Sequence, residues 1–100
     1  MINTIGRTLE FDTWLDGMKD VWAKAAVLTR LDRAEENNFG DCAPVGDGLS
    51  EMRVFVGLGY RVYFVRTGIS AYLMLWGSDK TDQKRGIKRA KEILDALRGR

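Results

Sequence analysis

Residues 49–66 have the sequence LSEMRVFVGLGYRVYFVR, in which two stretches rich in Val, Phe and Tyr are separated by Gly57-Leu58-Gly59. Aromatic and β-branched residues favour strands, and glycine adopts the backbone conformations that tight turns require. This stretch therefore predicts a β-hairpin with strands from Leu49 to Val56 and from Tyr60 to Arg66, joined by a three-residue loop.

Side chains alternate between the two faces of a strand, and in this hairpin the alternation separates an apolar face from a charged one. Pairing across the three-residue loop would set Arg53 opposite Tyr63 and Phe55 opposite Arg61, on the same face as Glu51. We expect this face to look toward solvent or a cleft. The opposite face is expected to meet the core and carries Met52, Val54, Val56, Val62 and Phe64.

Apolar residues at helical spacing precede the hairpin, and Thr8 is expected to cap the first helical turn. Two helices, or one kinked helix, both fit this spacing. The apolar positions are Phe11, Trp14, Leu15, Met18, Val21, Ala25, Leu28 and Leu31. The turn-forming residues between Glu35 and Gly48 then predict a loop.

A third strand is predicted from Ala71 to Trp76, and a short strand from Ile2 to Ile5 would complete the sheet. A C-terminal helix is predicted from the apolar stripe formed by Ile87, Ala90, Ile93, Leu94 and Leu97. The expected fold is α+β: one domain over residues 1–100, with two N-terminal helices packed on a small antiparallel sheet and a C-terminal helix.

The composition, 45% hydrophobic and 30% charged, is typical of a globular protein. No apolar run approaches the roughly 20 residues of a membrane span, so a soluble, cytoplasmic protein is expected. Cys42 is the sole cysteine and histidine is absent, so no zinc cluster, other metal site or cofactor is predicted. Cys42 is expected to be a bystander thiol in a loop, because no histidine can serve as its base.

The net charge of +2 is small, but its distribution is uneven. The C-terminal segment is basic and contains Lys80, Lys84, Arg85, Lys88, Arg89, Lys91, Arg98 and Arg100. Lys80 follows a predicted strand and precedes a predicted helix, where unpaired backbone N–H groups favour a phosphate. Gln83 and Lys84 could support that phosphate, and Trp76 could stack on a base.

Cleavage of RNA through its own 2′-hydroxyl requires a base, positive charge for the phosphorane and an acid for the leaving oxygen. Arg53, Arg61 and Lys80 would supply the charge. Because the chain has no histidine, the proton would have to be carried by Tyr63, Lys80 or Glu51 with a shifted pKa. Otherwise orientation and charge would provide most of the rate acceleration.

A simpler interpretation treats Glu51, Arg53 and Arg61 as ordinary cross-strand ion pairs on a solvated sheet face. The basic residues Lys88, Lys91 and Arg98 would likewise form a solvated helix face. Trp14 and Trp22 are expected to be core or partner-contact residues.

Three segments together resemble the HigB-type branch of the RelE/ParE toxin superfamily, the phage-related addiction module killer proteins. They are Glu51-Met52-Arg53, Gly57-Leu58-Gly59-Tyr60-Arg61-Val62-Tyr63-Phe64, and Gly77-Ser78-Asp79-Lys80-Thr81-Asp82-Gln83 followed by Ile87 and Ala90. The likeness runs from about Phe11 to Leu97. Ser78 stands where the family usually has a second glycine, and Gly86 where an aspartate commonly precedes the isoleucine.

The resemblance implies a microbial RNase-like fold and ribosome-dependent cleavage of messenger RNA. It also implies neutralisation by a cognate antitoxin that often carries a helix-turn-helix DNA-binding domain. By that resemblance Arg53, Arg61, Tyr63 and Lys80 would form the active centre, and Glu51 and Gln83 would support it.

Two alternatives remain open. A non-enzymatic toxin of the same superfamily that binds DNA gyrase would not need those four side chains to converge. A pure interaction module would use Trp14, Trp22 and the early helices instead of the sheet face.

Overall fold

The computed structural model describes residues 2–99. Within that range the elements are β1 (Thr4–Arg7), α1 (Leu9–Asp16), α2 (Val21–Glu35), β2 (Cys42–Gly46), β3 (Leu49–Val54), β4 (Tyr60–Gly68), β5 (Ala71–Asp79), a 3-10 turn η1 (Lys80–Asp82) and α3 (Gln83–Leu97). Arg100, counted above with the basic C-terminal segment, lies outside the described residues. The predicted α+β class is confirmed.

The strands of residues 2–99 form one sheet in the order β1-β5-β4-β3-β2. β1 runs parallel to β5, whereas the other neighbours are antiparallel. The expectation of a purely antiparallel sheet is therefore wrong at this edge. A parallel pair needs a long connection, and here the chain passes through both N-terminal helices and the central hairpins between β1 and β5.

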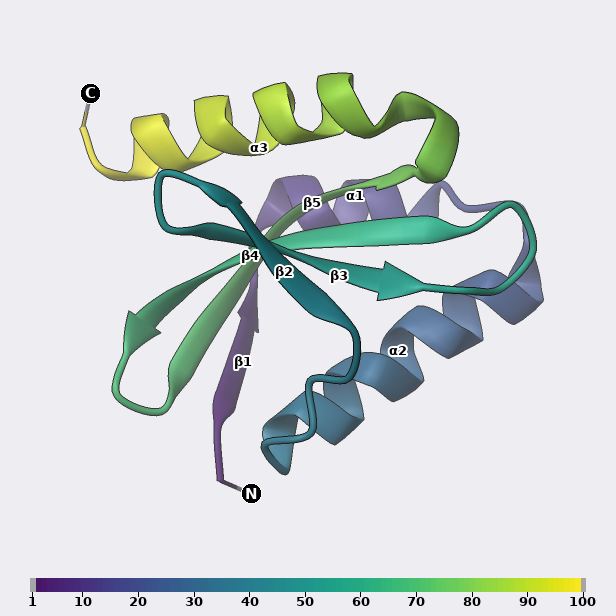
Figure 1. Cartoon of the computed structure of the whole chain (residues 1–100), viewed down its shortest axis with the longest axis horizontal. Helices are drawn as coiled ribbons and strands as arrows, with labels where there is room; N and C mark the ends of the chain where they lie inside the picture. Colours follow the sequence, from purple (N-terminus) through teal and green to yellow (C-terminus); the bar gives the residue numbers. More distant parts are fainter. Residues whose placement is uncertain (1, 100) are drawn as a thin grey trace.

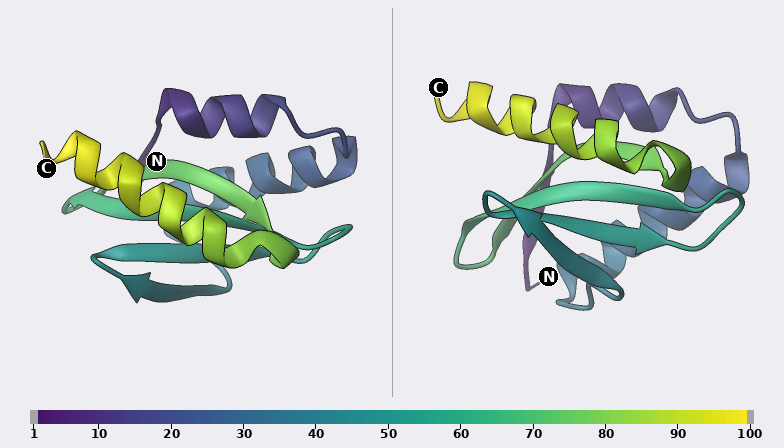
Figure 2. Two further views of the ribbon diagram at one scale, coloured as in Figure 1. Left: turned by 90° about the horizontal axis from the view of Figure 1, so that it is seen from above. Right: turned by 45° about the horizontal axis from the view of Figure 1, so that its top comes forward.

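Helices cover both faces of the sheet, and Figures 1 and 2 show the sheet lying between α2 and α3. One core forms where α1 and α2 meet the sheet, around Phe11, Val27 and Met52. A second core forms under α3, around Tyr63, Leu75 and Ile93. The charged face of the hairpin is therefore partly covered, because α3 packs on the same side of the sheet.

The N-terminal helices are two separate helices, each started by a side-chain cap. Thr8 Oγ1 accepts a hydrogen bond from the backbone N–H of Phe11 at 3.0 Å, as predicted. Asp20 Oδ1 accepts one from the N–H of Ala23, also at 3.0 Å. α1 ends at Asp16, and the chain restarts as α2 only after this second cap.

Three predicted boundaries are wrong. The segment expected to be a loop contains the edge strand β2, so Cys42 lies in a strand. Pro44 lies in the same edge strand, where the backbone N–H that proline lacks is least needed for pairing. β5 continues past Trp76 to Asp79. β1 begins at Thr4 rather than Ile2 and extends to Arg7.

The central hairpin is confirmed, but with a longer connection than three residues. β3 ends at Val54 and β4 begins at Tyr60, so residues 55–59 form the loop. Arg53 consequently lies opposite Arg61, and Glu51 lies opposite Tyr63. The shift of two residues leaves every side chain on its predicted face, because side-chain direction repeats every second residue.

Within residues 2–99 no helix is both long enough and apolar enough to cross a bilayer. The same residues contain no group of three or more His, Cys, Asp or Glu side chains arranged to hold a metal ion.

Candidate functional site

A shallow hollow of about 30 Å³ lies at the end of the central hairpin. Three cationic side chains reach it from separate elements: Arg53 from β3, Arg61 from β4 and Lys80 from η1. Its remaining lining consists of Val54, Phe55, Gly59 and Tyr60. The hollow is about the size of one water molecule, so a larger anion would rest on its rim rather than inside it.

Glu51 lies fully buried beneath this hollow. Its Oε1 accepts hydrogen bonds from Arg61 Nη1 and, at 3.2 Å, from Arg53 Nε. Gln83 Nε2 donates to Oε2 at 2.8 Å. A buried carboxylate is stable only when it is paired and hydrogen-bonded, so Glu51 orients the two arginines and Gln83. Because it has no contact with solvent, the expectation that it could act as a proton carrier is wrong.

The two arginines differ in how much charge they can offer a ligand. The Arg61 side chain is 19% exposed, and its Nε is buried without a hydrogen-bond partner among the described residues. The Arg53 side chain is 35% exposed and also pairs with Asp41 at 3.2 Å. The hydrogen bond to Glu51 raises the pKa of Arg53 most, partial burial opposes that shift, and Asp41 adds to it.

Arg53 and Arg61 are thus paired with the carboxylates of Glu51 and Asp41. Two further carboxylates, Asp20 and Asp79, lie near enough to raise the pKa of Tyr60 in the hollow's lining, after burial as the largest cause. The cross-strand ion pairs of the simpler interpretation are present, but Glu51 is buried rather than solvated.

Lys80 is brought to the hairpin by the end of β5. Its backbone N–H donates to the carbonyl of Gly59 at 3.0 Å, which ties η1 to the hairpin loop. Gly59 has a φ of +83°, and a Cβ placed there would lie 3.4 Å from Lys80 Cδ. The glycine therefore provides both the left-handed turn and the surface along which the lysine chain lies.

Tyr63 does not reach the hollow, so its predicted place in the active centre is wrong. Its side chain is fully buried in the α3 core. Its hydroxyl lies 2.8 Å from Ser78 Oγ and donates more weakly to the Gln83 carbonyl at 3.4 Å. Burial is the largest cause of a raised pKa for this hydroxyl, so Tyr63 is a poor proton carrier.

Tyr63→Phe is expected to lower the free energy of unfolding by about 1 kcal/mol at neutral pH, because Ser78 loses its buried partner. The raised pKa means that the folded state holds the proton of Tyr63 at pH values where the unfolded chain has released it. This contribution to stability is complete below about pH 10 and is lost as the pH rises through the folded-state pKa. Urea unfolding from pH 8 to pH 11 should therefore show a shallower alkaline loss for Tyr63→Phe, and an identical slope would contradict the burial of this hydroxyl.

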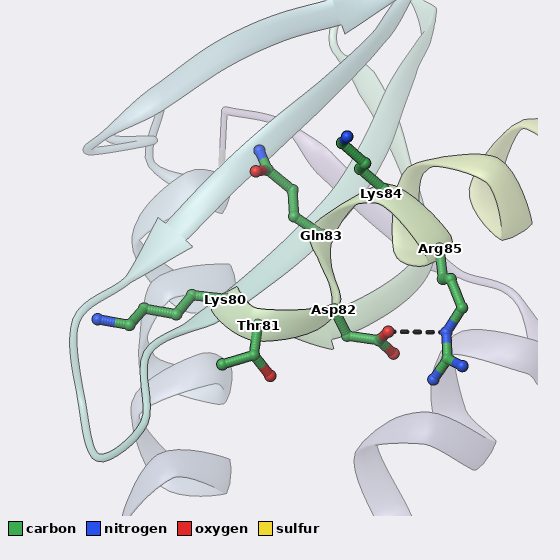
Figure 3. Close-up of a pocket in the computed structure, with 6 residues that line it drawn as sticks. All are labelled: Lys80, Thr81, Asp82, Gln83, Lys84 and Arg85. Carbon is green, nitrogen blue, oxygen red and sulfur yellow. Dashed lines mark hydrogen bonds and ion pairs between the residues drawn. The ribbon is translucent and has the colours of Figure 1, made fainter.

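A second and larger hollow, of about 300 Å³, is lined by residues 80–85 and shares Lys80 with the first. Figure 3 shows Gln83 and Lys84 projecting to one side of this segment, with Asp82 and Arg85 on the other. Asp82 pairs with Arg85 Nε at 2.8 Å and makes no side-chain cap to α3. The helical segment begins one turn earlier, at η1, where Asp79 Oδ1 accepts a hydrogen bond from the backbone N–H of Thr81 at 2.9 Å. A carboxylate therefore already caps this end, and phosphate binding beside Lys80 stays a prediction.

Trp76 lines neither hollow, and its role as a base-stacking platform stays a prediction. It is half-buried against the α3 core, and the guanidinium of Arg89 lies 5.7 Å from its ring centroid. One of the two ring faces is therefore next to a cation.

The predicted site does not include Phe55, Tyr60 or Asp41. Phe55 and Tyr60 line the hollow, and Asp41 pairs with Arg53. Phe55 could have been noticed, because alternation sets this aromatic residue on the charged face, two positions after Arg53. No sequence signal identifies Asp41, because its contact depends on the position of β2.

No protein-family model matches this chain. The chain is similar to a Haemophilus influenzae protein described as "Uncharacterized protein", with 41% identity over 93 residues. The matched region covers 93% of this chain and 94% of the relative. That description names no activity, so the resemblance to HigB-type toxins stays a prediction.

Proposed function

The chain belongs to one family with the Haemophilus influenzae protein, and we propose that it is the toxin of a type II toxin-antitoxin pair that cleaves messenger RNA on the ribosome. One observation carries the proposal: Arg53, Arg61 and Lys80 converge on one hollow from three elements. The toxin acts in the cytoplasm, and a cognate antitoxin with a helix-turn-helix domain neutralises it.

The chemistry that fits this hollow is transfer within the RNA strand. The 2′-oxygen attacks the adjacent phosphorus, a new P–O2′ bond forms, and the P–O5′ bond breaks. The products are a 2′,3′-cyclic phosphate and a 5′-hydroxyl end. Arg53, Arg61 and Lys80 stabilise the extra charge of the phosphorane, and the unpaired Nε of Arg61 offers a further donor if the guanidinium shifts toward the phosphate.

Proton transfer is the weaker part of this site, because Glu51 and Tyr63 are both fully buried. The proton of the 2′-hydroxyl therefore passes to solvent or to a group of the ribosome, and the leaving 5′-oxygen takes its proton from the same sources. The protein contributes charge and orientation, and a ribosome that holds the RNA in line supplies the rest.

The test is inducible expression in bacteria with mapping of RNA 5′ ends. Wild type should arrest growth and produce new 5′ ends within translated messages. The double variant Arg61→Ala/Lys80→Ala should lower cleavage by at least about 100-fold, because loss of a charge-stabilising group has effects of this size in other enzymes. The double variant Arg66→Ala/Lys88→Ala removes the same charge from exposed positions of β4 and α3 that do not line the hollow, and it should cleave like wild type. Tyr63→Phe should also retain cleavage.

Growth arrest without new 5′ ends would eliminate the RNase proposal. DNA breaks and an SOS response in that case would favour the gyrase-binding alternative. Equal cleavage by the hollow variant and the matched control would show that RNA is cleaved elsewhere.

An interaction module without catalysis is the second candidate, and one observation favours it. Val21 and Trp22, at the start of α2, are 75% and 82% exposed. The loop containing Leu58, which is 65% exposed, lies beside them, because a Cβ on Gly57 would come within 2.6 Å of Asp20 Oδ2. A chain that is folded in the cells and causes no arrest would support this candidate.

A further inference from the structure

Phe55 is a large apolar side chain left in solvent at the rim of the cationic hollow. It is 76% exposed and lines the hollow together with Arg53, Arg61 and Lys80. Neither core includes it. Its position therefore has no explanation in the packing of the described residues.

The backbone nevertheless holds Phe55 firmly in place. The N–H of Val56 donates to the carbonyl of Val54 at 3.1 Å, which makes Phe55 the central residue of a three-residue γ-turn at the end of β3. Val54 is 2% exposed and Val56 packs against the first core, so both neighbours are anchored. The backbone that carries the ring is therefore already ordered, and binding a ligand costs only the freedom of the side-chain torsions of Phe55.

Aromatic rings beside cationic grooves are how proteins bind unpaired nucleic acid: the cations hold the backbone and the ring stacks on a base. We propose that Phe55 stacks on the base of a nucleotide next to the phosphate held by Arg53, Arg61 and Lys80. This inference rests on the proposed function, and it identifies the ligand as an unpaired stretch of RNA. Bases inside a duplex have both faces occupied by neighbours and cannot stack on the ring.

The test measures binding of short 2′-O-methyl RNA, which cannot be cleaved at its 2′-oxygens. Phe55→Ala should bind a single-stranded hexamer between about 5-fold and about 150-fold more weakly than wild type, the range for loss of one stacked base. Phe55→Trp should retain wild-type binding. Ile69→Ala is the matched control, because Ile69 is 88% exposed in the β4–β5 turn, and it should bind like wild type.

A single abasic nucleotide, moved along the hexamer, identifies the stacked base. At one position it should weaken wild-type binding as much as Phe55→Ala does on intact RNA. Combining that RNA with Phe55→Ala should cause no further loss, because both changes remove the same contact. A duplex of the same sequence should bind more weakly and be insensitive to Phe55→Ala.

The outcomes separate this inference from the function on which it rests. One outcome overturns the stacking role but keeps RNA binding: the double variant Arg61→Ala/Lys80→Ala abolishes binding, whereas Phe55→Ala binds like the control Ile69→Ala. If Phe55→Ala weakens binding equally at every abasic position, the ring has no base partner and the inference is wrong. If wild type binds no RNA, both proposals fail together.

Discussion

Glu51→Ala is expected to lower the free energy of unfolding by about 3–5 kcal/mol, the cost of removing one partner from a buried ion pair. The carboxylate is fully buried and receives hydrogen bonds from Arg53, Arg61 and Gln83. Without it, two guanidinium groups repel each other across β3 and β4, and Gln83 loses its side-chain acceptor. Urea denaturation at neutral pH measures the change.

Asp41→Ala provides the matched control, because Asp41 also pairs with Arg53 but is 44% exposed. Solvent screens such a pair, so this variant should unfold close to wild type. If Glu51→Ala unfolded at the same urea concentration as Asp41→Ala, the buried network would not contribute to stability. Glu51→Ala should also reduce RNA cleavage, because the arginines would lose their orientation.

Gly86→Ala is expected to destabilise the protein by about 1–3 kcal/mol, the typical cost of overpacking a core. Helix propensity alone predicts the opposite, a gain of about 1 kcal/mol in α3. Gly86 is buried, and a Cβ there would lie 2.7 Å from Ser78 Oγ and 2.8 Å from Tyr63 Cε2. Both neighbours are themselves buried, so neither can move away cheaply.

A double-mutant cycle separates packing from propensity. Ser78→Gly removes one of the two side chains in the way, so Ser78→Gly combined with Gly86→Ala should lose less stability than the two single changes summed. Lys88→Ala, at an exposed position of α3, should stay within about 0.5 kcal/mol of wild type. A stabilised Gly86→Ala protein would mean that α3 does not approach the sheet so closely.

These contacts also explain the two positions at which the chain departs from the HigB-type pattern. Ser78 carries a side chain where that pattern has glycine, and Gly86 carries none where the pattern has aspartate. The serine side chain occupies the space that a side chain at position 86 would need. The two departures therefore compensate each other.

The candidate site was predictable in part. Alternation along the hairpin identified Arg53 and Arg61 as neighbours, and turn residues placed Lys80 at the start of the last helix. Alternation also predicts Tyr63 in the site, which is wrong. It indicates the face on which a side chain lies but not whether a helix covers that face. α3 buries Tyr63 and leaves Arg53 at the uncovered end of the same face.

The sequence by itself determined the helices, the central hairpin and the face on which each hairpin side chain lies, because these depend on the spacing of neighbouring residues. Only the tertiary structure decided the strand register, the existence of β2, the burial of Glu51 and the exposure of Phe55. Those features depend on contacts between residues far apart in the chain, such as Gln83 with Glu51 and Lys80 with Gly59. Local periodicity holds no information about such contacts, since they form only when packing brings the elements together.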